Sequence, residues 1–567
     1  MIDRRLLAHL FLAVVIVGCD GTGSGEASRT LTVETQWGPV QGVEDEGVFS
    51  YRGIPYAAPP VGELRWKPPV APVPWTQPRA ATAKPAICPQ APFAGLPVPG
   101  FNPSEDCLYL NVDTPVAGSN LPVMVWIHGG GFTLGEGLQT DGGTSGDRIA
   151  RETGTVVVSM NYRLGQLGFL AHPALTQEST DRASGNYGLL DQVAALQWVQ
   201  DNITAFGGDP DNVTLFGESA GGFSVCSQLA SPGSAGLFAK AIIMSGSCER
   251  PWPTLAVAEA QGQRFADALG CTSAEEPLAC IRDKPFDEVL AALPPGDNFG
   301  FNPTDDPQGT WGPVFDGAFF TEQPRESFAS GNFNRVPTIV GFTRDEARLF
   351  TWLAELSTPP LAVTEENYET LLSYYLAGDT DLAVKAAAEY PLDDYAVPML
   401  ALAAMVTDTV FRCPGRTEAA KLAQYVPTYL YQFEFSEGRS QLEVALPFLG
   451  GAPPGYDLGA FHGAEIPYVF GYDPLLEIDL QSFSTTLREW RPGTADEALW
   501  LRTLTYFTRF AATGEPGSPG GPDWPIYDAA AERYLAIDST MTVQTVPAAK
   551  CAFWDEEDYL QAQLRGE

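Results

Sequence analysis

The stretch Asn212-Val-Thr-Leu-Phe-Gly217-Glu218-Ser219-Ala220-Gly221-Gly222 indicates the fold class of this chain most clearly. Its first half is rich in β-branched and aromatic residues, as strands are, and an apolar run of helical character continues from it to Ala230. The glycines beside Ser219 leave room for a sharp strand-to-helix turn, which would expose the serine hydroxyl at the positive end of the helix. The stretch therefore predicts a nucleophile elbow, the turn that carries the attacking serine in many acyl-transfer enzymes.

Further strands are predicted where short apolar runs lie between turn residues. These runs are Leu121–Ile127, Thr155–Met160, Ala239–Met244, Val336–Gly341 and Pro427–Phe435. Between Gly188 and Phe206 the apolar residues recur at helical spacing, and the following glycine pair should end that helix. Strands that alternate with helices predict an α/β fold with a large, doubly wound, mostly parallel sheet, and the helical stretch near 360–425 is expected to form a cap.

The N-terminal residues have the composition of an export signal. Arg4 and Arg5 precede an apolar run that is too short to span a bilayer, and Gly18-Cys19 at its end resembles the bacterial lipoprotein box, whose cysteine receives a lipid. We expect a lipoprotein-type signal peptide over 1–19, a flexible tether over 20–29 and one large catalytic domain over 30–567. The protein would then be exported and either anchored in the cell envelope through Cys19 or, with a plain signal, secreted.

Charge and cysteine content limit the possible partners. The chain has 33 basic and 70 acidic residues, a net charge of −37, so nucleic acids and anionic lipid surfaces should be repelled, and membrane contact is expected only through the lipid anchor. The eight cysteines after Cys19 form an even set, which in an oxidising compartment favours disulfides. With four histidines and no Cys-x-x-Cys pattern, a zinc site is not expected, and acyl transfer by an activated serine needs neither a metal nor an organic cofactor.

A serine hydroxyl becomes a good nucleophile only when an imidazole accepts its proton, so the four histidines are the next candidates. His9 lies in the predicted signal and His128 begins a separate glycine loop. His172 precedes the serine, whereas enzymes with this elbow have the order serine, acid, histidine. His462, in a loop after the last predicted strand, is the remaining candidate base.

Two further groups are required, an acid for the imidazole and donors for the developing oxyanion. Glu346 directly follows a predicted strand and fits the acid, although its neighbour Asp345 fits as well. The segment His-Gly-Gly-Gly-Phe after the strand that ends near residue 127 can bring backbone N–H groups close to a substrate carbonyl, because glycines have no side chain in the way. We therefore assign the oxyanion hole to Gly130, Gly131 and Ala220.

At this point the chain resembles the type-B carboxylesterase and cholinesterase family of the α/β-hydrolase superfamily, from about residue 32 to the C-terminus. Besides the elbow, the glycine loop and the histidine segment, the matching segments are Phe49–Ala57, Ser104–Asn111, Asn161–Gly165, Gly185–Gln192 and Phe206–Pro210. The resemblance implies a triad of Ser219, Glu346 and His462, which selects Glu346 over its neighbour. It also implies that Glu218 and Ser245 lie beside the triad.

The resemblance also implies disulfides, which the spacing of the cysteines alone does not select. The implied pairs are Cys88 with Cys107, Cys271 with Cys280, and Cys413 with Cys551. Cys226 and Cys248 are then left as a fourth pair, with two buried free thiols as the alternative.

The expected activity is that of a serine carboxylesterase, which hydrolyses small neutral carboxylic esters through an acyl-enzyme. The cholinesterase branch holds a quaternary ammonium group with a tryptophan between its first disulfide cysteines, and the loop Pro89–Asp106 contains none. The alternatives are a lipase or sterol esterase of the same family and, from a different class, a non-catalytic esterase-like protein that binds partners at the cell surface.

Overall fold

The structure is a computed structural model, which describes residues 31–90, 102–139, 143–274, 276–293, 311–355, 362–376, 378–436, 455–479, 484–488, 495–546 and 548–557. The predicted signal peptide over 1–19, the lipid anchor at Cys19 and the tether over 20–29 lie outside these residues and stay predictions, as does the start of the domain at residue 30. Within the described ranges, no helix combines the length and the apolar character needed to cross a membrane.

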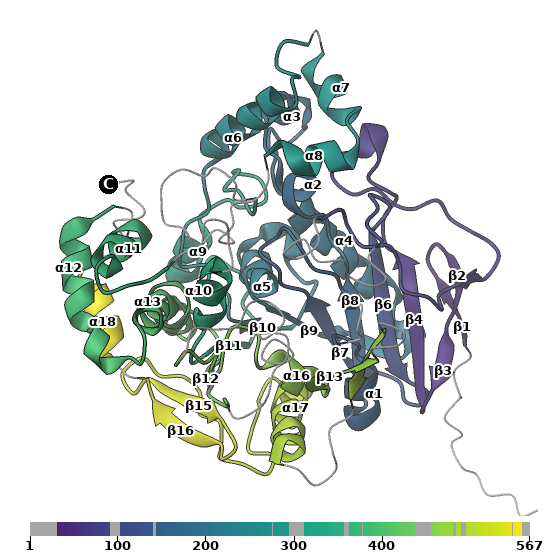
Figure 1. Cartoon of the computed structure of the whole chain (residues 1–567). Helices are drawn as coiled ribbons and strands as arrows, with labels where there is room; N and C mark the ends of the chain where they lie inside the picture. Colours follow the sequence, from purple (N-terminus) through teal and green to yellow (C-terminus); the bar gives the residue numbers. More distant parts are fainter. Residues whose placement is uncertain are drawn as a thin grey trace, which may run out of the picture.

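One large sheet of eleven strands organises the molecule, and in Figure 1 it runs from the purple N-terminal strands to the yellow C-terminal ones. Neighbouring strands are parallel from β15 to β8, and the strands at both edges are antiparallel. This confirms the predicted α/β fold with a mostly parallel sheet. In spatial order the strands are β16 (Thr542–Thr545), β15 (Arg533–Ile537), β12 (Thr428–Phe433), β11 (Thr338–Thr343), β10 (Lys240–Met244), β9 (Gly208–Glu218), β7 (Leu121–Ile127), β8 (Val156–Met160), β6 (Tyr109–Pro115), β4 (Val48–Pro55) and β3 (Val43–Asp45).

The sheet is buried on both faces, as the strand β7 illustrates. Its residues Val123, Val125 and Ile127 belong to one hydrophobic core, and the intervening Met124 and Trp126 belong to the core on the opposite face. Helices cover both faces: α4 (Tyr187–Asn202), α5 (Ala220–Ala230) and α14 (Cys413–Leu422) pack on the first, and α1 (Asp147–Thr153), α16 (Ile466–Phe470) and α17 (Ala495–Thr513) pack on the second. Because β7 is buried on both faces, all of these positions must be apolar, and the strand reads as a continuous apolar run.

Several edge strands were not among those predicted, and β6 shows the reason. Its polar residues Asn111 and Asp113 are buried, because Asn111 donates to Oγ of Ser159 at 3.1 Å and Asp113 accepts from Oγ of Ser50 at 2.6 Å. These partners lie 48 and 63 residues away in the sequence. A pattern of local hydrophobicity does not reveal such pairs, so this strand was not predicted.

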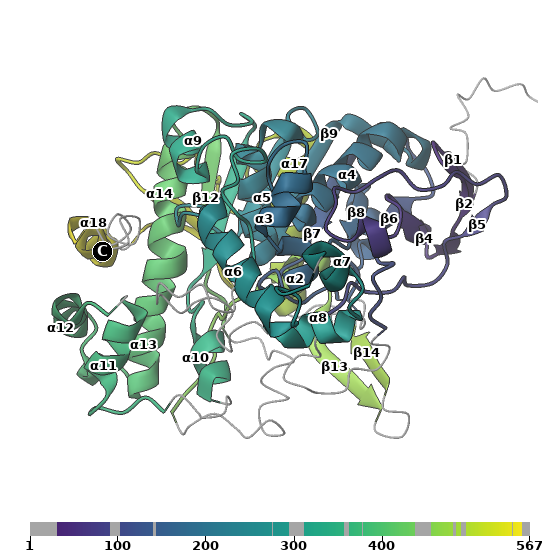
Figure 2. The same ribbon diagram turned by 90° about the horizontal axis from the view of Figure 1, so that it is seen from above.

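Two groups of helices interrupt the alternation of strands and helices, and Figures 1 and 2 show them in different places beside the sheet. The first group, between β10 and β11, is α6 (Leu255–Ala268), α7 (Pro277–Arg282) and α8 (Phe286–Ala292), and the second, between β11 and β12, is α10 (Arg348–Glu355), α11 (Tyr368–Tyr375), α12 (Thr380–Glu389) and α13 (Pro398–Thr407). The predicted cap near 360–425 is thus helical where described, but its last helix, α14, packs directly on β11 and β12. A π-helical turn, Asp408–Arg412, joins α13 to α14.

The remaining elements are short. They are α2 (Gly165–Phe169), α3 (Pro173–Glu178), α9 (Pro324–Ser330), α18 (Ala548–Glu556), a small sheet of β1 (Thr32–Thr35), β2 (Gly38–Gln41) and β5 (Arg79–Ala80), and a hairpin of β13 (Asp473–Asp479) and β14 (Ser484–Arg488).

The structure forms all four of the expected disulfides. They are Cys88–Cys107, Cys226–Cys248, Cys271–Cys280 and Cys413–Cys551. The second of these pairs is therefore bonded rather than a pair of free thiols. The last one joins the start of α14 to α18 over a sequence separation of 138 residues, whereas the third spans only 9 residues.

We expect these two disulfides to differ in their contribution to stability. In the chain-entropy model, the long loop closed by Cys413–Cys551 corresponds to about 5 kcal/mol and the short loop closed by Cys271–Cys280 to about 3 kcal/mol. The double variant Cys413→Ser/Cys551→Ser should therefore lose about 2 kcal/mol more in free energy of unfolding than Cys271→Ser/Cys280→Ser. Urea unfolding followed by circular dichroism measures the difference, and equal urea midpoints for the two variants would contradict the expectation.

Candidate active site

The predicted elbow is present at the end of β9. The strand ends at Glu218, α5 begins at Ala220, and Ser219 between them adopts φ 57° and ψ −124°, a conformation that L-residues rarely take. Glycine at 221 is required, because a Cβ atom there would lie 2.0 Å from the carbonyl oxygen of Ile127. The turn thus lifts the serine away from the sheet at the carboxyl end of its strands, where α/β folds bind ligands.

The glycine loop follows β7 and lies against the elbow. A Cβ atom on Gly129 would be 3.1 Å from Cβ of Ser219, and one on Gly130, where φ is +105°, would be 2.2 Å from the carbonyl oxygen of Leu134. In the part of the chain that the structure describes, the N–H groups of Gly130 and Gly131 have no acceptor. These two donors are therefore available to an oxygen atom placed beside Ser219.

The candidate acid and base are joined directly. Nδ1 of His462 lies 2.6 Å from Oε2 of Glu346, and the other carboxylate oxygen of Glu346 accepts from the backbone N–H of Thr343 at 2.7 Å. Glu346 is fully buried just after β11, as expected for an acid that follows a strand. Because a carboxylate only accepts, Nδ1 carries the hydrogen, which leaves Nε2 as the basic atom.

Asp345, the alternative that the local sequence left open, points elsewhere. Its carboxylate forms ion pairs with Arg344 at 2.8 Å and Arg348 at 3.0 Å. It also accepts from the backbone N–H of Ala460 at 2.9 Å. Asp345 therefore helps to hold the loop that leads to His462 and does not contact the imidazole.

Two aromatic rings flank the imidazole of His462. The ring centroids of Phe350 on α10 and Phe411 in the π-helical turn lie 4.8 and 5.0 Å from it. The same turn supports the acid, because Arg412 donates to the carbonyl of Arg344 at 2.9 Å. π-helical turns are rare and often occur at functional sites, and here the turn contacts His462 and the segment that leads to Glu346.

The structure places the imidazole beside the elbow without a hydrogen bond to the serine. Nε2 of His462 lies 3.2 Å from Oε1 of Glu218, the residue before Ser219. Among the described residues, Nε2 makes no hydrogen bond. In enzymes without substrate, such serine–histidine contacts are often long and tighten only when substrate binds.

Three buried carboxyl groups surround His462, one more than the sequence predicted. Oε1 of Glu465 accepts from Oγ of Ser245 and from the hydroxyl of Tyr431, each at 3.3 Å. Ser245 thus lies near the site, as expected. Its partner Glu465, three positions after His462, was not among the residues predicted from the sequence. Within the described ranges, no group of acidic, histidine or cysteine side chains, this cluster included, is arranged to hold a metal ion.

With this geometry in place, comparison with known proteins identifies the family. A model of the carboxylesterase family matches residues 29–554. The chain belongs to the carboxylesterase family. As the matching relatives are ester hydrolases, the protein is a carboxylic ester hydrolase of the α/β-hydrolase superfamily, and its substrate is a small-molecule ester.

Individual carboxylesterase relatives are similar over almost their whole length. The para-nitrobenzyl esterase of Bacillus subtilis strain 168 is 36% identical over 527 residues, covering 91% of this chain and 97% of that protein. The acylcarnitine hydrolase of Mus musculus is 35% identical over 574 residues, covering 96% of this chain and 93% of that protein. A solved structure of a PNB esterase matches with a TM-score of 0.73 and 34% identity, covering 94% of this chain and all of that one.

Opposing effects set the pKa of His462 in this carboxylesterase. Burial lowers the pKa, because it disfavours the charged imidazolium, but the carboxylates of Glu218 and Glu346 raise it by more. Burial also raises the pKa of the Glu218 carboxyl, and burial together with the Glu218 and Glu346 charges raises that of Glu465. The basic form of His462 therefore prevails only at a higher pH than for an ordinary histidine.

We expect the variant Glu218→Gln to change the pH profile of ester hydrolysis. It removes a carboxylate that raises the pKa of His462, so this pKa falls. A histidine that accepts the serine proton must be neutral, so activity rises as pH increases through its pKa. The acidic limb of kcat/KM should therefore move to lower pH by on the order of one unit, equivalent to about 1.4 kcal/mol.

The matched control for this profile is Glu369→Gln, which neutralises an exposed carboxylate on α11. Both variants are assayed with the same p-nitrophenyl ester across the titration range of imidazole. The control should leave the acidic limb in place. A shift of the Glu218→Gln limb to higher pH would show that the charge of Glu218 acts with the opposite sign.

Proposed function

We propose that the protein is a serine carboxylesterase that hydrolyses neutral carboxylic esters through an acyl-enzyme, with Ser219, His462 and Glu346 as its triad. The observation that carries the proposal is the 2.6 Å contact between Glu346 and Nδ1 of His462, with the opposite ring nitrogen facing the elbow segment. Membership of the carboxylesterase family supports the reaction class. The arrangement of serine, histidine and acid supports the mechanism.

In the first half of the reaction, Nε2 of His462 takes the proton of Ser219 while Oγ attacks the ester carbonyl carbon. The carbonyl oxygen becomes an oxyanion, which accepts hydrogen bonds from the N–H groups of Gly130, Gly131 and Ala220. Ala220 belongs to the first turn of α5, where N–H groups lack partners within the helix. His462 then returns the proton to the departing alcohol oxygen, and the acyl group remains on Ser219.

In the second half, a water molecule replaces the alcohol. His462 takes a proton from this water as its oxygen attacks the acyl carbonyl carbon, and it returns the proton to Oγ of Ser219 as the carboxylic acid leaves. Glu346 keeps its hydrogen bond to Nδ1 throughout and stabilises the imidazolium in both halves. The same three side chains and the same three backbone N–H groups therefore serve both steps.

Replacing the nucleophile tests the mechanism. Ser219→Ala should lower kcat by roughly 10⁴-fold or more, because no acyl-enzyme forms, while the free energy of unfolding changes little. Ser231→Ala, which alters another buried serine near the end of α5, should retain activity. Titration of the unaltered protein with a chromogenic organophosphate should give one covalent adduct per chain, located on Ser219 by peptide mass spectrometry.

The outcome of this titration also separates an enzyme from a binding protein. A non-catalytic esterase-like protein would hydrolyse no ester and form no stoichiometric adduct. An adduct on another residue, or full activity in Ser219→Ala, would contradict the assigned nucleophile.

The charge of the chain leads to a preference among substrates. The net charge of −37 and the three carboxyl groups around His462 disfavour an anionic acyl chain. We expect kcat/KM for mono-p-nitrophenyl glutarate to be at least about tenfold lower than for p-nitrophenyl 5-methylhexanoate, which has the same shape without the charge. Added salt should bring the kcat/KM values of the two esters closer together, because it screens the surface charges. Equal kcat/KM values for this matched pair would contradict the preference for neutral esters.

A further inference from the structure

We propose that His128 positions the oxyanion hole by holding the peptide group between Gly129 and Gly130, so that the N–H of Gly130 faces the substrate. The inference rests on the proposed function and assigns a role to a histidine outside the triad. Its basis is a hydrogen bond at 2.8 Å between Nδ1 of His128 and the carbonyl oxygen of Gly129.

Each carbonyl group of the glycine loop has its own hydrogen-bond donor. The carbonyl of His128 accepts from the hydroxyl of Tyr162 at 3.0 Å, that of Gly129 accepts from the imidazole, and that of Gly130 accepts from the backbone N–H groups of residues 133 and 134, each at 3.0 Å. In a trans peptide the C=O and the next N–H point in opposite directions. The N–H groups of residues 129, 130 and 131 are therefore turned away from these partners, and none has an acceptor in the described part of the chain.

The imidazole of His128 is suited to act as a permanent donor. The carbonyl of Gly129 only accepts, so Nδ1 must carry the hydrogen. Burial lowers the pKa of His128 to about 4, so the ring stays neutral at the pH at which His462 works as a base. A hydrogen bond to a carbonyl also polarises the amide, which makes the N–H of Gly130 a stronger donor.

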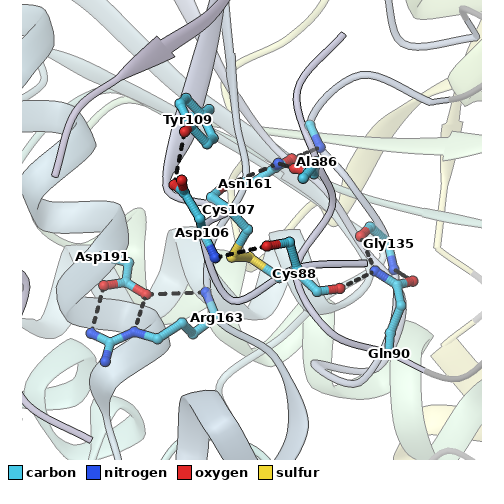
Figure 3. The surroundings of a disulfide bond; sticks show 12 residues. Ala86, Cys88, Gln90, Asp106, Cys107, Tyr109, Gly135, Asn161, Arg163 and Asp191 are labelled. Atoms are coloured by element: carbon cyan, nitrogen blue, oxygen red, sulfur yellow. Dashed lines mark hydrogen bonds and ion pairs between the residues drawn. A yellow bond between two sulfur atoms is a disulfide. The ribbon is translucent and has the colours of Figure 1, made fainter. Parts of the chain in front are cut away.

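The position of this imidazole is fixed from two sides. Its ring stacks on that of Tyr162, with centroids 4.4 Å apart. On the other side it occupies space that a side chain at Gly135 would need, since a Cβ atom there would lie 2.3 Å from Nδ1. Gly135 is held in turn by Gln90, which donates to its carbonyl at 2.8 Å and accepts from its N–H at 2.9 Å. Figure 3 shows this pair beside the Cys88–Cys107 disulfide.

Two variants of nearly equal shape test the inference. His128→Asn keeps an N–H donor at the place of Nδ1, whereas His128→Leu puts a methyl group there. We expect His128→Leu to lower kcat for p-nitrophenyl acetate by roughly tenfold to hundredfold with KM changed less than about twofold, because the lost contact acts only on the transition state. His128→Asn should recover most of the lost rate. In both variants the acidic limb of the pH profile should stay where it is in the unaltered enzyme.

A transition-state analogue gives a readout that a loss of packing would not reproduce. 2,2,2-Trifluoroacetophenone is expected to add to Ser219 and present a hemiketal oxyanion to the same N–H groups. Its inhibition constant should rise in His128→Leu by about the factor by which kcat/KM falls. The histidine control is His172→Leu, which removes the side-chain cap of α3 and should leave both values unchanged. Gly135→Ala should resemble His128→Leu, because its Cβ atom would crowd both Nδ1 of His128, at 2.3 Å, and the carbonyl oxygen of Gly129 that the imidazole holds, at 2.5 Å.

The possible results separate this inference from the proposed function. Folded His128→Leu and Gly135→Ala variants with the kcat and inhibition constant of the unaltered enzyme would overturn the role of His128. An equal loss in His128→Leu and His128→Asn would overturn it as well, because the donor would then be irrelevant. If instead the unaltered protein neither hydrolysed p-nitrophenyl acetate nor formed an organophosphate adduct, the proposed function itself would be wrong.

Discussion

The parallel register of four central strands is the constraint on which the rest of the site depends. Ile127 of β7 pairs with Gly217 of β9, Glu218 pairs with Met244 of β10, and Met244 pairs with Gly341 of β11. Because parallel strands end on the same side, the glycine loop, the elbow, Ser245 and the loop with Glu346 all leave the sheet at one edge. A shift of one residue between two strands would turn their side chains to the opposite face and separate these groups. The apolar side chains on both faces of the sheet oppose such a shift.

Two histidines at this edge have opposite electrostatic environments. His462 is buried among Glu218, Glu346 and Glu465, whose charges outweigh the effect of burial and raise its pKa. For His128, burial is the dominant effect, and its pKa is lowered. The same type of side chain therefore has a raised pKa at position 462 and a lowered pKa at position 128. The charges of the neighbouring residues make the difference, since both imidazoles are buried.

Local sequence patterns were sufficient for the central strands and for the candidate nucleophile. Leu121–Ile127 is apolar on both faces and was predicted with the bounds that the structure has. The pattern failed where buried polar groups meet partners from distant segments. The strand β6 was not predicted, because its polar residues Asn111 and Asp113 pair with serines of other strands. Glu465 was missed for the same reason, and the choice between Asp345 and Glu346 needed either a family resemblance or the direction of each side chain. A local hydrophobicity pattern identifies residues that are buried because they are apolar. It does not identify polar residues that are buried because they pair with distant segments.

The Cys413–Cys551 disulfide imposes an order on the assembly of the protein. Synthesis proceeds from the N-terminus, so the cysteines of the other three pairs have been made before residue 413, and only this bridge waits for residue 551. The other three bridges, which span 19, 22 and 9 residues, therefore have both of their cysteines while the chain is still growing. His462 lies between Cys413 and Cys551, so the segment with the candidate base is the last to be closed by a disulfide.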